Sequence, residues 1–161
     1  MTVRLFGAAA ILAVGILLGA RGSAAATEHI RQLEGLLLLV RHVRERISCF
    51  HTPKERIFLT FRHEALSRIG FLRELCRGDM TAALQACRDS LYLSEEELAI
   101  LFEFSAGLGQ GYLAEELSRC ELAAGRLEGA LAAAREGLPR TAGIYRTVAV
   151  SGALAVILVF L

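Results

Sequence analysis

The distribution of charge along the chain is the feature that most constrains its fold. Every Asp and Glu lies between Glu28 and Glu136, and the flanking regions are almost free of charge. Sixteen uncharged residues separate Arg4 from Arg21, and none of the last 15 residues, which follow Arg146, carries a charged side chain. The sequence therefore predicts an apolar segment at each end and a charged domain between them.

Both apolar segments are candidates for membrane spans. Apolar residues make up 54% of the chain, and its mean hydropathy of +0.46 is high for a soluble protein. A 16-residue helix covers about 24 Å of a bilayer core of roughly 30 Å, and snorkelling side chains can bridge the difference. We expect transmembrane helices over 3–21 and 144–161 and a helical domain over 22–143. The expected interface anchors are Arg4, Arg21, Tyr145 and Arg146.

Each span has an alternative interpretation. The first segment also resembles a signal peptide, with Arg4 as its basic region and Gly22-Ser23-Ala24 as a small-residue cleavage site. That alternative predicts a mature N-terminus near Ala25. The second segment could instead be a buried core helix, although no other element is large enough to cover it on all sides.

Basic residues indicate the orientation in the membrane. Only Arg4 lies beyond the first span, whereas most arginines near the spans lie on the side of the middle domain. Those on the inner side are Arg21, Arg31, Arg135, Arg140 and Arg146. We therefore expect a two-span protein of the cell membrane with its central domain in the cytoplasm.

Apolar periodicity predicts helices throughout the middle domain. Residues 28–46 show one apolar face, in which residues recur at spacings of three and four. Thr52-Pro53 has the character of a helix start, and a single apolar stripe follows it up to Gly78. The first face consists of Leu33, Leu36, Leu37, Val40, Val43 and Ile47, and the second stripe of Phe58, Phe61, Ala65, Ile69, Leu72 and Cys76.

Three further features complete the predicted antiparallel helical bundle. Asp79 can cap a short helix, and Ser94-Glu95-Glu96-Glu97 has the form of a capping box. The short helix would bury Met80, Ala83, Leu84, Cys87 and Leu91, and the next would bury Leu98, Leu101, Phe102 and Ser105. A heptad-spaced seam follows at Leu113, Leu117, Cys120, Ala124, Leu127 and Leu131. We expect Gly137 and Pro139 to loosen or kink the passage into the second span.

No motif in the sequence points to catalysis, a cofactor or a metal. The four histidines lie at no metal-ligand spacing and are expected to be solvated or capping residues. Gly107, Gly109 and Gly111 lack the Lys-Ser/Thr of a phosphate loop and favour a helix-ending turn. Cys76, Cys87 and Cys120 lie on apolar stripes and are expected in a reduced core.

Two surface features can serve protein contacts. Arg41, Arg44 and Arg46 form a basic cluster that can face anionic lipid or an acidic partner, with a solvated helix face as the alternative. Gly125-x-x-x-Gly129, followed by several alanines, makes one helix face small enough for close approach of another helix, within the chain or outside it.

Three segments taken together resemble the stage III sporulation protein AB family. They are Glu45–Pro53, the pattern Leu101-x-x-Phe104-x-x-x-Leu108-Gly109, and Tyr145-Arg146-Thr147 before the apolar tail. The family has Tyr where Phe50 stands and Leu where Lys54 stands. After Leu-Gly the family favours Asp and Gln, at positions held here by Tyr112 and Glu115. The predicted docking surface consists of Arg41, Arg44, Arg46, Tyr112 and Glu115.

The resemblance implies a non-enzymatic platform in a channel-like assembly of endospore formation. The family's middle domain is similar to the cytoplasmic domain of the inner-membrane platform protein of type II secretion. The implied partners are other stage III sporulation proteins, above all the secretion-type ATPase stage III sporulation protein AA, and membrane lipid. The implied location is the mother-cell-facing membrane around the forespore. The balance of 18 basic and 17 acidic residues argues against nucleic acid.

A second class of function stays open from the residues alone. A membrane-anchored regulatory or enzymatic domain would need ionisable side chains that converge in space. A docking platform needs only an exposed, well-ordered surface.

Overall fold

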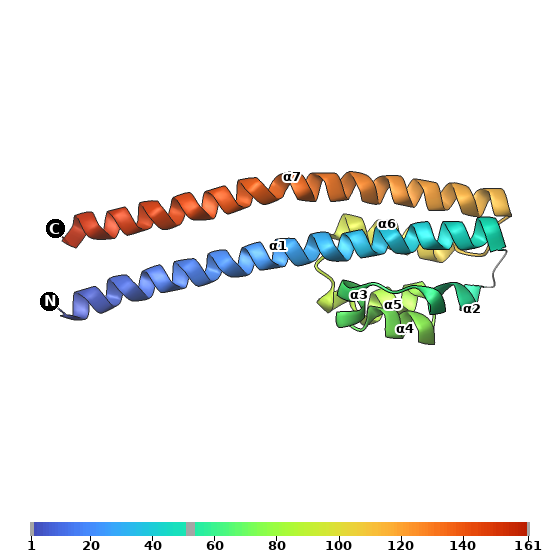
Figure 1. Ribbon diagram of the computed structural model, residues 1–161, viewed down its shortest axis with the longest axis horizontal. Helices are drawn as coiled ribbons and strands as arrows, with labels where there is room; N and C mark the ends of the chain where they lie inside the picture. Colours follow the sequence, from blue (N-terminus) through green and yellow to red (C-terminus); the bar gives the residue numbers. More distant parts are fainter. Residues whose placement is uncertain (1, 51–53, 161) are drawn as a thin grey trace. The chain divides into compact units, whose positions relative to one another are not determined.

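The fold is all-helical wherever the chain is described. The computed structural model describes the backbone of residues 2–50 and 54–160 and the side chains of residues 24–48 and 56–137. Every regular element in these ranges is a helix, which confirms the predicted all-α fold (Figure 1). The elements are α1 (Thr2–Phe50), α2 (Lys54–Ile57), η1 (Phe58–Thr60), α3 (Glu64–Arg68), α4 (Phe71–Arg77), α5 (Met80–Ala86), η2 (Arg88–Ser90), α6 (Glu95–Gly107) and α7 (Leu113–Phe160).

The chain divides into two compact units. Met1–Thr27 and Ala134–Leu161 form one, and Glu28–Ala133 forms the other, which lies inside the predicted domain 22–143. Among the described residues, no helix combines the length and the apolar character needed to cross a bilayer. The side chains of both predicted spans, 3–21 and 144–161, lie outside the described set, and the spans stay a prediction. The same holds for the side chains of Arg4, Arg21, Tyr145 and Arg146.

Helix α1 is the central element of the Glu28–Ala133 unit. Figure 1 shows it between α7 and the short helices α2–α5. Its predicted apolar face is confirmed, except that Ile47 is only half-buried, and Leu39 is buried as well. The fully covered residues are Leu33, Leu36, Leu39, Val40 and Val43. Burial this wide around a helix follows because α1 packs against α7 on one side and the short helices on another.

The prediction of one continuous helix after Thr52-Pro53 is wrong. The chain is instead divided among α2, η1, α3 and α4, with extended backbone at Phe61 (φ −78°, ψ 137°) and at His63 (φ −152°, ψ 128°). His42 of α1 donates from Nε2 to the Ile57 carbonyl oxygen at 3.1 Å, and its ring lies 5.5 Å from that of Phe61. These contacts with α1 satisfy a carbonyl at the end of α2 and bury Phe61, so tertiary packing outweighs helical continuity.

Glycine ends the next short helix. Gly70 has a φ of +79°, the left-handed conformation that terminates many helices. Because the helix ends here, the predicted apolar stripe does not continue along one face into α4. Cys76, expected in the core, is therefore exposed. Thr52 and Pro53, the expected start of the helix, lie outside the described residues.

Both predicted caps in the middle of the chain are confirmed. The Asp79 carboxylate accepts a hydrogen bond from the Ala82 amide at 2.7 Å. Ser94 and Glu97 form a full capping box, each side chain accepting from the other's backbone amide. The five residues expected to be buried around α5 are all buried. Around α6, Leu98 and Leu101 are buried as expected, whereas Phe102 and Ser105 are half-buried.

Helix α7 packs antiparallel to α1 within the same unit. Arg41 lies 2.7 Å from Glu128, and Arg44 lies 2.7 Å from Glu121, so the pairs run in opposite directions along the two helices. The buried seam comprises Cys120, Ala124, Leu127 and Leu131. The first two residues of the predicted seam are not part of it. Leu117 is half-buried, and Leu113 is exposed at the start of the helix.

Gly137 and Pro139 do not interrupt α7, which runs on to Phe160. The backbone is therefore not interrupted at this passage, and the kink that we expect there stays a prediction. A proline removes one helical hydrogen bond, and the bonds on either side hold the remaining backbone in the helix.

Candidate docking surface

The loop between α6 and α7 is held in one conformation by two side chains of α7. Glu116 is only 5% exposed, and its carboxylate accepts hydrogen bonds from the Gln110 amide at 3.0 Å and the Gly111 amide at 3.1 Å. Arg119 donates to the Gly107 carbonyl oxygen at the end of α6. Gly109, with a φ of +74°, makes the turn. The glycines therefore form a helix-ending turn, as the sequence predicts.

This fixed loop presents an exposed apolar tip. Tyr112 is 85% exposed, and the adjacent Leu113 is 43% exposed. Glu115, in the first turn of α7, is exposed as well. Tyrosine on an ordered backbone loses little conformational entropy when it is covered, and such residues are frequent anchors in protein interfaces. The structure thus brings two predicted docking residues, Tyr112 and Glu115, together at the start of α7.

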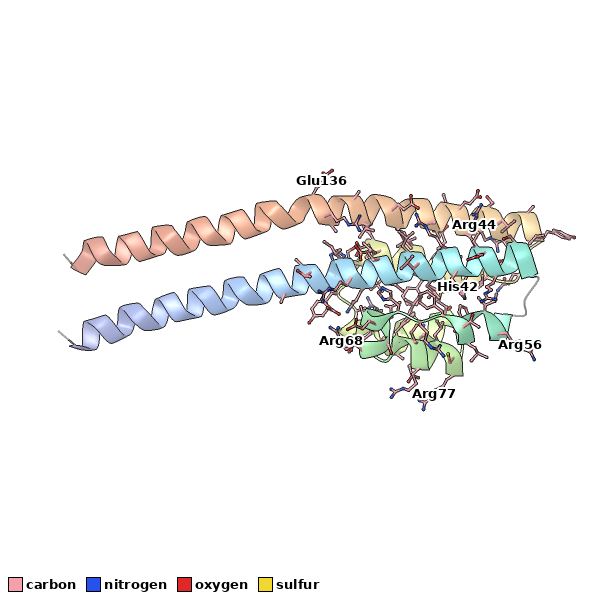
Figure 2. All side chains as sticks on the ribbon, in the orientation of Figure 1. His42, Arg44, Arg56, Arg68, Arg77 and Glu136 are labelled. Carbon is pink, nitrogen blue, oxygen red and sulfur yellow. The ribbon has the colours of Figure 1, made fainter. Side chains whose placement is uncertain are left out.

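The predicted basic cluster lies elsewhere and is engaged within the chain. Arg41 and Arg44 pair with Glu128 and Glu121 of α7, and all four side chains are about half exposed. Arg44 is labelled on this side of α1 in Figure 2. Arg46 is half-buried. The two pairs connect α1 with α7, and the arginines stay about half exposed.

Sequence reasoning missed a polar contact between α1 and α6. His29 donates from Nε2 to the Glu97 carboxylate, with distances of 2.9 and 3.0 Å to its two oxygens. Gln32 is fully buried, donates to the Ser90 carbonyl oxygen and accepts from the Tyr92 amide at 2.8 Å. The capping box revealed the position of Glu97, but no local signal could reveal its partner on α1. These contacts hold the loop before α6 against α1.

No metal-binding constellation is present among the side chains that the structure describes. No group of three or more His, Cys, Asp or Glu residues converges there. His63 has a buried Nδ1 without a hydrogen-bond partner, and its ring lies so close to Gly35 of α1 that an added Cβ would clash. The His63 ring therefore fills the space between α1 and the short helices.

The cysteines differ in their surroundings. Cys87 and Cys120 are buried, as expected, and Cys76 is exposed, while the side chain of Cys49 lies outside the described residues. Burial, reinforced by the Glu116 carboxylate, raises the pKa of the Cys120 thiol to about 11. Burial also raises the pKa of Cys87. Both buried thiols therefore stay protonated and unreactive at neutral pH.

Helix α7 carries a second stripe, which we call the outer face. It consists of exposed residues spaced by four, three, four and three positions: Ser118, Leu122, Gly125, Gly129 and Ala132. No atom of the bundle lies within 4 Å of an added Cβ at Gly125 or Gly129. Each glycine costs the helix about 1 kcal/mol relative to alanine, yet internal packing requires neither of them to be small.

These features define a helical bundle domain with an ordered, exposed loop. A solved structure titled "Stage III sporulation protein AB (SpoIIIAB)" has a similar fold, with a TM-score of 0.56 and 22% sequence identity. The alignment covers 70% of this chain and 97% of that one. No curated protein matches the chain at a significant level.

The profile of the stage III sporulation protein AB family matches residues 4–161, nearly the whole chain. The chain belongs to the stage III sporulation protein AB family, as its sequence motifs indicate. Membership identifies the chain as a component of sporulation.

Proposed function

We propose that the chain is a non-enzymatic, integral membrane component of a sporulation complex. In this proposal its helical domain acts as a platform that docks other subunits during endospore formation. The observation that carries the proposal is Tyr112, an exposed aromatic side chain on a loop fixed by the buried Glu116. Family membership supports the assignment of the partners to the stage III sporulation proteins.

The geometry of the loop favours docking over other uses. Because Glu116 and Arg119 hold the backbone before a partner arrives, binding need not order the loop. Tyr112 and Leu113 together offer an apolar anchor, and the exposed Glu115 offers a carboxylate at its rim. A basic, partly apolar recess is the complement that this tip requires.

The finer assignments rest on the resemblance. We place the domain in the cytoplasm of the mother cell, on the membrane around the forespore, with both apolar segments as spans. The resemblance implies the secretion-type ATPase stage III sporulation protein AA as a partner, and we propose that it binds the Tyr112 loop. The uncharged ends of the chain and the inner-side arginines support the membrane orientation.

Topology can be tested with a cysteine at Ser94, which is exposed at the start of α6. Cys49 and Cys76 are replaced by Ser, and the buried Cys87 and Cys120 are retained. We expect Ser94→Cys in the full chain to react with an impermeant maleimide only after the cytoplasmic side is opened. Labelling in intact cells would contradict the cytoplasmic platform.

Docking can be tested by co-purification from sporulating cells. We expect Tyr112→Ala with Leu113→Ala to reduce recovery of other stage III sporulation proteins at least about tenfold, the effect of losing one interface hot spot. Tyr92→Ala is the matched control, because Tyr92 is also an exposed tyrosine but lies before α6. Equal recovery with both variants would overturn the docking role of the loop.

A further inference from the structure

We propose that the outer face of α7 packs against the outer face of a second copy of this chain, with the two helices parallel. This inference concerns Ser118–Ala132 and goes beyond the docking of other subunits at the Tyr112 loop. It rests on three observations: an unpartnered face, its spacing, and the charges on its two sides.

The outer face has the spacing and the exposure of a helix contact that lies outside the bundle. Its residues repeat at four and three positions, the pattern of a heptad seam. Leu122 is 54% exposed, and nothing in the bundle approaches Gly125 or Gly129. Two such faces can come close together because the glycines leave the backbones unobstructed. Beside Leu122, a hollow toward α6 is lined by the apolar Ile100 and Phe104 and by the charged Glu103, Arg119 and Arg126.

Charges of opposite sign flank this face and identify its occupant. Arg119 and Arg126 lie on one side, and Glu121 and Glu128 lie on the other. In a parallel pair of helices, residues flanking the seam meet residues from the opposite side of the partner's seam. Glu121 then faces Arg126 of the partner subunit, and two-fold symmetry repeats the attraction. A second copy is therefore a partner with complementary charge.

The same pattern disfavours the antiparallel arrangement. Antiparallel helices would place the glutamate side against the glutamate side and the arginine side against the arginine side. Like charges at these positions repel. Parallel packing also suits α7, which continues as one helix toward the predicted second span, because copies in one membrane share their direction.

Ion pairs within each subunit leave the flanking charges available. Arg126 contacts Glu103 at 2.7 Å, and Arg44 contacts one carboxylate oxygen of Glu121 at 2.7 Å. All four side chains are about half exposed. Association would join the two pairs into one row of alternating charge across the interface, without removing either internal contact.

Disulfide trapping in the full chain tests the arrangement. Single cysteines are introduced at Ser118, Gly125, Gly129 and Ala132, with Cys49 and Cys76 replaced by Ser and the buried cysteines kept. Mild oxidation of membranes should give a homodimer from all four variants, at least about tenfold above exposed controls Ala82→Cys and Ala99→Cys. Trapping near Gly125 and Gly129 but not at Ser118 or Ala132 would indicate a crossed or antiparallel contact and overturn the parallel arrangement. No dimer above the controls, or a disulfide to another protein, would overturn self-association.

Charge reversal supplies a second measurement that does not require a cysteine in the helix. Arg126→Glu should reduce chemical cross-linking of the full chain roughly tenfold, because both inter-subunit pairs become repulsive. Adding Glu121→Arg should restore it when Arg44→Gln and Glu103→Gln are also present, so that neither reversed charge meets a like charge within its own subunit. Glu103→Gln is the control, since it removes the internal partner of Arg126 and should leave the dimer intact. Loss with Glu103→Gln, or no restoration by the double reversal, would contradict the proposed pairing.

Discussion

The two faces of α7 share one periodicity and differ in what they contact. The inner seam is the buried seam of α7 described above. It places Cys120, Ala124 and Leu127 against the bundle, where all three are buried. The outer face repeats at the same intervals, yet its members, including Leu122 and Gly125, are exposed. Spacing therefore shows which residues share a face, whereas side-chain size and the available neighbours decide which face forms the core.

The largest expected effect is the difference in stability between shortening a leucine of the inner seam and shortening a leucine of the outer face. Leu127 is fully buried, and Leu127→Ala should lower the free energy of unfolding by about 3 kcal/mol through lost burial and a cavity. At a dilution where the chain is monomeric, Leu122→Ala should change it by less than about 0.5 kcal/mol. Urea unfolding of the detergent-solubilised full chain, followed by circular dichroism, measures both. Similar losses for the two variants would remove the distinction between the faces.

The next largest effect on stability concerns the loop between α6 and α7. Glu116→Ala leaves the Gln110 and Gly111 amides without their acceptor and should cost about 1–3 kcal/mol. Glu115→Ala, at an exposed neighbour, should be close to neutral. Limited proteolysis should cut Glu116→Ala faster between Gly107 and Tyr112. An unchanged cleavage rate would show that Glu116 does not fix the loop.

The inner seam should also make stability depend on pH. Burial raises the folded-state pKa of the Cys120 thiol to about 11, from 9.0 for a thiol in water. The unfolded thiol therefore loses its proton first as the pH rises. Its contribution is complete below pH 9.0 and is lost toward about pH 11, a decrease on the order of 1–2 kcal/mol. Cys120→Ala should flatten this decrease, and the exposed Cys76→Ala should not. Melting curves from pH 8 to 11 measure the difference.

The smallest effect belongs to the ion pairs between α1 and α7. Arg44→Ala should lower stability by no more than about 0.5 kcal/mol, because the pair with Glu121 is half exposed and screened by salt. A double-mutant cycle with Glu121→Ala measures the coupling energy. A coupling well above 1 kcal/mol would mean that this pair, as well as the apolar seam, holds the two helices together.

Local signals predicted those parts of the fold that depend on local chemistry. The caps at Asp79 and Ser94, the turn at Gly109 and the apolar face of α1 each follow from residues close together in sequence. The break at Phe61 could not be predicted, because it depends on His42 of α1 reaching the Ile57 carbonyl oxygen. The exposure of Cys76 follows from the second break, at Gly70, which directly precedes α4.

The same limit applies to the candidate site. The sequence indicated Tyr112 and Glu115, but it gave no sign that Glu116 would be buried beneath the loop. Nor could it indicate that Arg41 and Arg44 pair with Glu128 and Glu121, because these partners on α7 lie far away in the chain. Long-range ion pairs and buried carboxylates require the tertiary arrangement before they can be assigned.

Photo-crosslinking at position 112 tests the central claim, the docking of other sporulation proteins at the α6–α7 loop, most directly. A photoreactive phenylalanine analogue replaces Tyr112 in the full chain, and replaces Tyr92 as the control, in sporulating cells. We predict an adduct with another stage III sporulation protein at position 112 that is absent at position 92. No adduct at position 112, or the same adducts at both positions, would contradict the docking role.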